Sequence, residues 1–478
     1  MSGKENKNNI ENVKIKELKE KLFLNRENLG HSMPTGDIRK AVKFCEKYKK
    51  FLDLSKTERE VVDYAVTILR REGFTEFREG KRYTTGDKLF YLNRGKALVA
   101  AIIGKEGLDK GVNILASHID SPRIDLKQNP LYEDAELALF KTHYYGGIKK
   151  YQWTTVPLAL HGVIVKADGT IVKVNIGESE DDPVFVITDL LPHLAQQQYK
   201  RPSADLVKGE ELNLLIGSMP FRSGERTKES DLVKLNIMNV LFEKYGIVES
   251  DFRSAELEAV PAFKATDVGF DRSLIGAYGQ DDRVCAYTTL MATVACRIPT
   301  RTVVTVLADK EEVGSDGNTG LNSQFLEHFI EALAEVKSVP LRTVLLNSRC
   351  ISADVSAAFD PTFANVLEKM NAPYLNHGAV LMKYTGSRGK SGTNDASAEY
   401  VGYIRSLFDE NNVSWQTGML GKVDTGGGGT VAKFISALNV DTIDVGVPML
   451  SMHSPFEITA KKDIYMAYKA FTAFANSK

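Results

Sequence analysis

Five short motifs combine histidine with acidic residues, the side chains that bind divalent cations and move protons in hydrolases. Carboxylate and imidazole groups suit Zn²⁺, Co²⁺ and Mn²⁺, and one further carboxylate can act as a base. The ordered set therefore predicts a two-metal hydrolytic site. In chain order the motifs are Ala116-Ser117-His118-Ile119-Asp120, Gln280-Asp281-Asp282-Arg283, Asp309-Lys310-Glu311-Glu312-Val313-Gly314-Ser315, Ser352-Ala353-Asp354-Val355-Ser356 and Met452-His453-Ser454-Pro455.

The first two motifs are weak indications when each is taken alone. In His118-x-Asp120, the alternation of a strand would turn both side chains to the same side. One could then bind a metal ion while the other orients a ligand, although a hydrogen-bonded structural histidine is commoner. Asp281 opens a predicted helix, where a carboxylate could bridge two cations or simply cap the helix.

The other three motifs are also weak evidence individually and favour a metal site only as a set. Glu311 and Glu312 are adjacent and could divide the roles of base and metal ligand, yet paired glutamates are common on exposed loops. Asp354 could equally be a turn aspartate, and a lone histidine such as His453 is more often structural. The five motifs are independent signals, and they occur at equivalent points of the predicted topology. Together they favour a binuclear metal site.

Buried strands predict how these motifs meet. Apolar runs at 97–104, 112–117, 302–309 and 442–447 are typical of buried strands, as are the successive segments 343–347 and 350–354. Four of the five motifs follow such strands. Sites in parallel sheets form at the carboxyl ends of strands, so we expect the motifs to converge there.

Helical patterns alternate with these strands. Apolar spacing of three and four predicts helices at 38–72, 284–297, 323–336, 396–411 and 429–438. The alternation predicts an α/β protein whose main domain is a mostly parallel sheet covered by helices on both faces, an α/β/α arrangement. The glycines at 426–429 lack the spacing of a dinucleotide-binding loop. They predict either a loop that lies close to other backbone or a flexible rim near the site.

The middle of the chain has a different pattern. Short alternating segments at 153–160, 162–166 and 170–175, with the turn 167–169, predict a hairpin within a β-rich unit. Since 478 residues exceed one ordinary core, we expect a first part of the main domain at residues 1–126, an inserted β-rich domain at 127–264, and the second part at 265–478.

Composition limits the function classes. Net charge is −1, and hydrophobic and charged residues make up 43% and 26% of the chain, which is ordinary for a globular enzyme. We expect no nucleic-acid or membrane partner. The amino terminus lacks a signal-peptide pattern, and four scattered cysteines form no CxxC pair. These features favour a cytoplasmic protein with free thiols.

With these motifs in place, the chain resembles the aspartyl aminopeptidase family of metalloaminopeptidases, which includes the vacuolar aminopeptidase I type, and is most similar to its bacterial branch. The resemblance runs from about residue 30 to the carboxyl terminus. It includes Tyr144-Tyr145-Gly146-Gly147, Leu191-Pro192-His193-Leu194-Ala195, and the stretch from Asn376-His377-Gly378 to Lys383. It implies that the middle domain mediates dimerisation and that dimers form a tetrahedral dodecamer.

The resemblance also implies roles for individual residues. The first zinc ion would be held by His118, Asp281 and Asp354, and the second by Asp281, Glu312 and His453. Glu311 would be the general base and Asp120 would orient a ligand or water. Substrate binding would involve His193, reaching a neighbouring subunit's site, and Lys383, near the side-chain pocket.

We therefore expect a two-zinc aminopeptidase, with Co²⁺ or Mn²⁺ as alternative metals, that removes single residues from peptide amino termini. Residues 376–391 depart from the aspartyl aminopeptidase pattern, so an acidic and a neutral or hydrophobic first residue both stay open. Two other functions also stay open: a related two-metal deacylase or carboxypeptidase, and a non-catalytic assembling scaffold.

Overall fold

The computed structural model describes residues 14–24, 26–222 and 229–478. Its largest sheet within those residues has nine strands, in the order β1-β2-β3-β14-β4-β15-β19-β17-β18. The neighbouring strands β14, β4, β15 and β19 are all parallel. The bounds of these strands are β1 Thr75–Glu76, β2 Lys88–Asn93, β3 Ala97–Ile102, β4 Val112–His118, β14 Thr302–Ala308, β15 Arg349–Ser352, β17 Ala379–Met382, β18 Trp415–Thr417 and β19 Asp441–Gly446.

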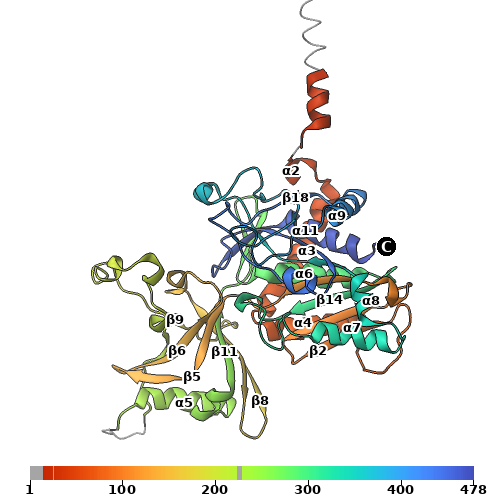
Figure 1. Cartoon of the computed structure of the whole chain (residues 1–478). Helices are drawn as coiled ribbons and strands as arrows, with labels where there is room; N and C mark the ends of the chain where they lie inside the picture. Colours follow the sequence, from red (N-terminus) through yellow and green to blue (C-terminus); the bar gives the residue numbers. More distant parts are fainter. Residues whose placement is uncertain (1–13, 25, 223–228) are drawn as a thin grey trace, which may run out of the picture.

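Helices cover both faces of this sheet (Figure 1). Along β4, Leu115 packs on one face, against a core shared with α3, α4, α6, α9 and α11. Its neighbours Ile114 and Ala116 pack on the opposite face, against α7, α8 and α10. This alternation explains why the central strands are apolar throughout, and the predicted α/β/α fold is confirmed. The helices are α3 Thr35–Leu54, α4 Glu58–Arg71, α6 Gln280–Ala295, α7 Phe325–Glu335, α8 Leu341–Leu346, α9 Ala398–Glu410, α10 Ala432–Ser436 and α11 Lys461–Ala475.

Two predicted elements are wrong. The helix expected at 38–72 is interrupted after Leu54 and restarts at Glu58, because Thr57 and Glu60 form a capping box that begins a new helix. The strand expected at 343–347 belongs to the helix α8, which follows Pro340. An apolar run this short fits either element, and proline before the first turn favours the helix.

A second sheet forms a separate lobe, at the lower left of Figure 1. Its order is β8-β7-β11-β5-β6-β10-β9, and it packs on the helix α5, Leu232–Tyr245. The hairpin predicted around 167–169 is present as the antiparallel pair β7 and β8. The division at 127 and 264 stays a prediction. The strands are β5 Arg123–Asp134, β6 Leu137–Tyr145, β7 Leu158–Val165, β8 Ile171–Ile176, β9 Val186–Ile187, β10 Leu214–Gly217 and β11 Ala255–Pro261.

A small third sheet joins the chain ahead of α6 to the segment ahead of α11. Its order is β12-β13-β21-β20-β16. Its strand β13 precedes Asp281 in the chain, and its strands β20 and β21 flank His453. Its strands are β12 Thr266–Val268, β13 Leu274–Ala277, β16 Ser356–Ala357, β20 Pro448–Leu450 and β21 Glu457–Ala460.

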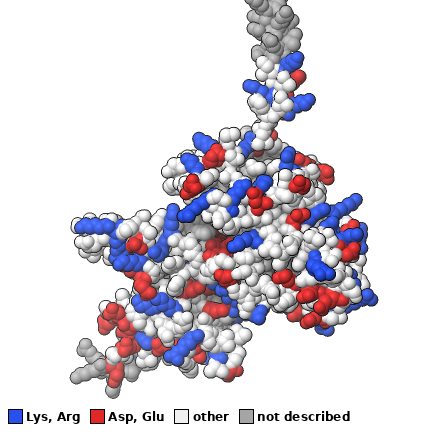
Figure 2. Space-filling model, viewed as in Figure 1, with Lys and Arg blue, Asp and Glu red and all other residues white. Residues whose placement is uncertain are grey.

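On the face drawn in Figure 2, lysine, arginine, aspartate and glutamate side chains are interspersed over both lobes. Mixed charge of this kind creates no broad field of one sign. Within the described ranges, no helix has the combination of length and apolar character that crossing a membrane requires.

Candidate active site

The sheet topology brings the sequence motifs together. His118 ends β4, and in the parallel pair with β14 it lies opposite Ala308. Glu311 and Glu312 therefore follow directly beside it, in a short turn of 3-10 helix. Asp354 comes two residues after β15, on the other side of β4. The carboxyl ends of neighbouring parallel strands thus supply four of the candidate residues.

Asp281 and His453 reach the same place from the third sheet. Asp281 lies in the first turn of α6, where its backbone is not helical, and its peptide bond to Asp282 is cis. His453 follows β20 in a left-handed backbone conformation. The Glu457 carboxylate fixes both segments, because it accepts the Asp281 amide at 3.0 Å and the His453 amide at 2.8 Å.

The two oxygens of Asp281 face different histidines. Oδ1 lies 3.3 Å from His118 Nε2, and Oδ2 lies 3.3 Å from His453 Nε2. Around them are three overlapping groups of potential ligand atoms, and within each group the atoms lie within 4.8 Å of one another. Two of the groups contain Asp281. The groups are His118, Asp281 and Asp354; Asp281, Glu312 and His453; and His118, Glu311 and Glu312. Asp281 is thus positioned between two clusters of donors.

Both histidines have a defined orientation. Nδ1 of His118 lies 3.1 Å from the Asp120 carbonyl oxygen and 3.3 Å from its carboxylate. Nδ1 of His453 lies 2.8 Å from the Gly147 carbonyl oxygen. Each carbonyl can accept only from a protonated Nδ1, so Nε2 of each ring is directed to the carboxylates, as in metal-binding histidines.

The cluster holds more negative charge than its surroundings neutralise. Burial raises the pKa of Glu311 to about 7, and burial with the Asp281 charge raises that of Glu312 well above its usual range. The Asp354 pKa is also raised well above normal, by burial and by Asp282. Opposing charge on a bound cation would relieve this repulsion. The donor set of carboxylates and imidazoles fits zinc and its near relatives.

The histidines carry the compensating protons. Burial would lower the pKa of His453, but its hydrogen bond to Asp281 and the charge of Glu312 raise it to about 10. Burial also opposes ionisation of Asp281, yet hydrogen bonds from His118 and His453 hold its pKa below the usual range. Both rings thus occupy positions where a divalent cation would replace a proton.

A cavity of about 310 Å³ opens onto this cluster. Besides the candidate ligands, it is lined by apolar side chains, hydroxyl groups and the backbone of three consecutive glycines, but by no lysine or arginine among the described residues. The glycine run approaches other backbone closely: a Cβ on Gly427 would lie 2.1 Å from the Gly386 oxygen. The lining comprises Val355, Ser356, Met382, Thr385, Leu420, Gly427, Gly428, Gly429, Thr430 and Met452.

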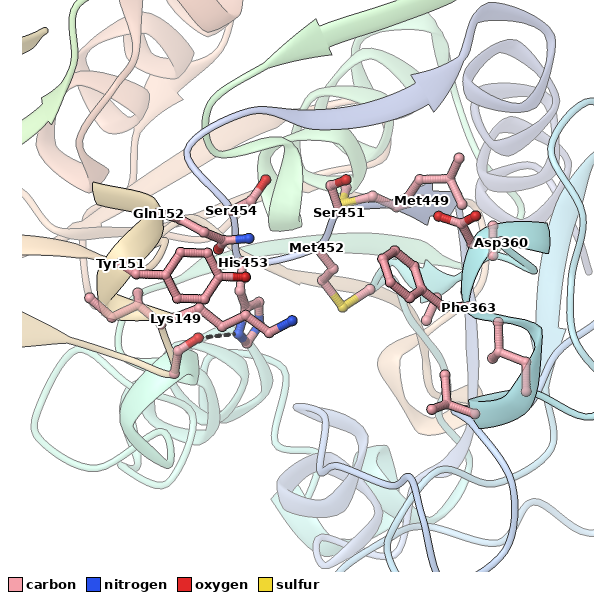
Figure 3. Close-up of a pocket in the computed structure, with 17 residues that line it drawn as sticks. Lys149, Tyr151, Gln152, Asp360, Phe363, Met449, Ser451, Met452, His453 and Ser454 are labelled. Atoms are coloured by element: carbon pink, nitrogen blue, oxygen red, sulfur yellow. Dashed lines mark hydrogen bonds between the residues drawn. The ribbon is translucent and has the colours of Figure 1, made fainter. Parts of the chain in front are cut away.

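A larger cavity of about 670 Å³ adjoins it and shares Met452 and His453. Figure 3 shows Met452 between Tyr151, from the inserted lobe, and Phe363, from the segment after β16. Tyr151 and Phe363 are 46% and 60% exposed. The cavity therefore offers uncovered apolar surface directly beside the cluster.

Neither of the two predicted substrate-binding residues lines the cavities at the cluster. The ammonium of Lys383 forms an ion pair with Asp395, and its neighbours Met382 and Thr385 line the small cavity instead. His193 lies in an exposed turn of the inserted lobe and lines neither cavity. Their proposed roles stay predictions.

Three supporting residues were not predicted: Tyr145, Gly147 and Glu457. Tyr145 and Gly147 stand in a motif noted only for its resemblance. Glu457 carries a signal that was overlooked, since it is a glutamate four residues after His453 at the start of an alternating strand segment. Burial, with the Asp281 charge, raises its pKa to about 8.

The α/β/α fold and this cluster define a metal-dependent hydrolase. The family model "Aminopeptidase I zinc metalloprotease (M18)" matches residues 51–475. The chain belongs to this M18, or aminopeptidase I, family and is a metalloaminopeptidase.

Individual relatives agree with this assignment. "Probable M18 family aminopeptidase 1" of Clostridium acetobutylicum is 51% identical over 440 residues, covering 90% of this chain and 94% of the relative. A crystal structure of an M18 aminopeptidase from Thermotoga maritima has a TM-score of 0.90 at 44% identity and covers 95% of this chain and 100% of its own. Aminopeptidase I from C. acetobutylicum has a TM-score of 0.88 at 48% identity, with coverage of 95% and 100%.

Proposed function

We propose that this enzyme releases single amino acids from peptide amino termini with two zinc ions per subunit. His118, Asp281 and Asp354 would hold one ion, and Asp281, Glu312 and His453 the other. The observation that carries the proposal is the position of Asp281, whose two carboxylate oxygens face the two histidines at the same distance of 3.3 Å. When bound, such ions polarise the scissile carbonyl and lower the pKa of the attacking water.

Glu311 is the proposed general base. Its side chain is 18% exposed, and its carboxylate lies 3.9 Å from His118 Nε2. Glu311 also forms a group of potential ligand atoms with His118 and Glu312, but it belongs to neither of the two proposed zinc sites. A carboxyl whose pKa burial raises to about 7 can take a proton near neutral pH and release it again. Glu311 would remove a proton from the attacking water and deliver it to the leaving amine. Asp120 would keep the His118 ring and the Glu311 turn in place.

We also propose a preference for a neutral, apolar first residue. The small cavity has Met382, Leu420 and Met452 in its lining. Lys383, which could have bound an acidic side chain, is paired with Asp395. Because no lysine or arginine among the described residues lines the small cavity, the side chain of an aspartate or glutamate there would lack a cationic partner, and burial would disfavour its charge.

The rest of the peptide would lie in the larger cavity. The larger cavity shares Met452 and His453 with the small one, so it would lie beside the scissile bond of a residue held in the small cavity. Apolar contact with Phe363 and Tyr151 would favour an apolar second residue (Figure 3).

We further propose that the subunits dimerise through the inserted lobe and assemble into a tetrahedral dodecamer, with His193 reaching a neighbouring site. The loop around His193 exposes Leu190, Leu191 and Leu194 by 50% or more, a patch suited to an interface. A fold relative at 22% identity, S. cerevisiae mApe1, is described as a dodecamer. A cytoplasmic location is also proposed, supported by four buried, unbridged cysteines in the described residues.

A chromogenic aminoacyl panel tests the function. With the zinc-loaded enzyme, leucyl and methionyl substrates should react at least tenfold faster than aspartyl, glutamyl or lysyl substrates. N-acetyl-leucyl substrate should not react, because an aminopeptidase requires a free amine. Cleavage of the acetylated substrate would instead support a deacylase. Failure with all free-amine substrates would reject the proposal.

A further inference from the structure

One short segment of the inserted lobe lies directly against the catalytic cluster. Tyr145 ends β6, and Gly146 and Gly147 follow it. Tyr145 contacts the base side of the cluster, and Gly147 contacts the His453 side. We call residues 145–147 the bridging segment, because they join the inserted sheet to two separate parts of the site.

The first contact reaches Asp120. The Tyr145 hydroxyl donates to Asp120 Oδ2 at 2.7 Å. The same carboxylate accepts the Glu311 amide at 3.1 Å and the Glu312 amide at 3.2 Å, and its Oδ1 lies 3.3 Å from His118 Nδ1. Asp120 is fully buried, so its two oxygens depend on these donors. The tyrosine hydroxyl is the donor among them that comes from the inserted lobe.

The tyrosine ring is itself held firmly. The Arg123 guanidinium lies over the ring, 3.9 Å from its centre, and Arg123 and Tyr145 are paired across β5 and β6. Arg123 is anchored by ion pairs with Glu58 of the main domain and Glu258 of the inserted sheet. Because the ring is fixed by these contacts, the hydroxyl has a defined position relative to Asp120.

The second contact supports His453. The Gly147 carbonyl accepts its Nδ1 proton at 2.8 Å, as the dashed line in Figure 3 shows. A Cβ on Gly146 would lie 3.4 Å from Glu312 Oε2, and Gly146 has φ +74°. The left-handed backbone thus disfavours a side chain at Gly146, where the bridging segment passes Glu312 at van der Waals distance.

We propose that Tyr145 is a positioning residue for the proposed base. Its hydroxyl fixes the Asp120 carboxylate, which in turn holds the Glu311–Glu312 turn through two backbone amides. Through this link the inserted lobe sets the geometry in which Glu311 meets water. The inference rests on the proposed aminopeptidase function.

A hydroxyl deletion with a matched control tests this role. Tyr145→Phe removes one oxygen and keeps the ring. Tyr400→Phe removes an equally buried hydroxyl that donates to the Cys350 carbonyl at 3.0 Å, away from the cluster. Zinc content, thermal midpoint, kcat and KM on a leucyl chromogen would be measured for the parent enzyme and both variants.

Tyr145→Phe should lower kcat about tenfold, the effect of raising the barrier by about 1.4 kcal/mol, with KM changed less than twofold and zinc fully retained. Tyr400→Phe should keep kcat within twofold. In an Asp120→Asn background, adding Tyr145→Phe should cost less than twofold further, because the hydroxyl acts through that carboxylate.

Other outcomes would overturn the inference. Equal losses in the two tyrosine variants would indicate a general effect of rigidity. Loss of zinc from Tyr145→Phe would indicate support of ligands, not of the base. A full further loss in the Asp120→Asn background would remove Asp120 from the link. An active parent with unchanged Tyr145→Phe turnover would reject this inference alone, whereas a parent inactive on every aminoacyl substrate would reject the proposed function.

Discussion

Replacing Glu311 by glutamine should separate turnover from metal binding. The substitution keeps the size of the side chain and the backbone amide that bonds to Asp120 at 3.1 Å. It also leaves His118, Asp281, Asp354, Glu312 and His453 unchanged, so zinc content should stay at the parent level. What is lost is a group that can accept a proton.

General base catalysis contributes about 10²–10⁴ in rate, which corresponds to about 2.7–5.4 kcal/mol of barrier. Burial raises the pKa of Glu311 to about 7 in the metal-free cluster, and bound zinc would lower it, so the carboxylate that accepts protons predominates at pH 8. At pH 8 we therefore expect kcat to fall at least 100-fold. In the parent enzyme the rate should rise with pH as Glu311 ionises, with a midpoint below the metal-free value of about 7 because bound zinc favours the carboxylate, and this rise should disappear in Glu311→Gln.

The assay is steady-state hydrolysis of a leucyl chromogen from pH 5.5 to 9, with zinc measured by elemental analysis on the same samples. Glu410→Gln is the control, because Glu410 is exposed on α9 and its turnover should match the parent. Glu311 is not the general base if Glu311→Gln keeps its zinc and retains more than a third of parental turnover, or if the pH dependence survives the substitution.

Three further predictions concern other parts of the molecule. His161 contacts Glu60 at 2.8 Å and Glu178 at 3.2 Å. Burial would lower the pKa of His161, but these two bonds raise it above its normal value. The stabilising effect of the protonated ring is therefore complete below the unfolded pKa of about 6.5 and is lost as pH rises through the folded pKa. His161→Gln should thus cost about 2–4 kcal/mol at pH 6 and less at pH 9, measured as thermal midpoints; equal shifts at both pH values would contradict this. Phe363→Ala should lower kcat/KM for Leu-Phe about tenfold, since about 50 Å² of lost burial is worth about 1.3 kcal/mol, while Leu-Gly changes less than twofold; a common loss for both dipeptides would rule out a second-residue pocket. Chelation should abolish activity and lower the thermal midpoint, because a metal at about 1,000 times its Kd stabilises the fold by about 4 kcal/mol; added zinc should restore both, and unchanged melting would argue against bound metal.

The sequence was informative where a local pattern determines structure. Buried, β-branched runs such as 302–308 are strands, and the residues that follow them meet because parallel neighbours end at one edge. The convergence of His118, Glu311 and Asp354 could therefore be predicted from strand ends alone. The convergence of Asp281 and His453 could be inferred only because aspartate and histidine are metal-binding residue types. Their positions could not be predicted from strand ends, since the third sheet positions both residues.

Other features depend on contacts that no local pattern records. The apolar run at 343–346 fits both a strand and a helix, and contacts between α8 and α7 add to the preference for the helix that Pro340 gives. Tyr145 reaches Asp120 across 25 residues, and Gly147 reaches His453 across 306. The sequence neighbours of Lys383 line the small cavity, but the Lys383 ammonium forms an ion pair with Asp395, outside that cavity.

The inserted sheet begins at β5 and returns at β11, and these two strands are hydrogen-bonded neighbours, with Ile124 opposite Ala259. Entry and exit of the lobe thus lie side by side, and the nine-stranded sheet contains no strand from it. Such an arrangement lets evolution enlarge, shrink or exchange the lobe with little damage to the rest of the fold. Catalysis would limit that freedom: any replacement would have to present a carbonyl to His453 at the same position as Gly147 does, so the bridging segment is constrained far more than the rest of the lobe.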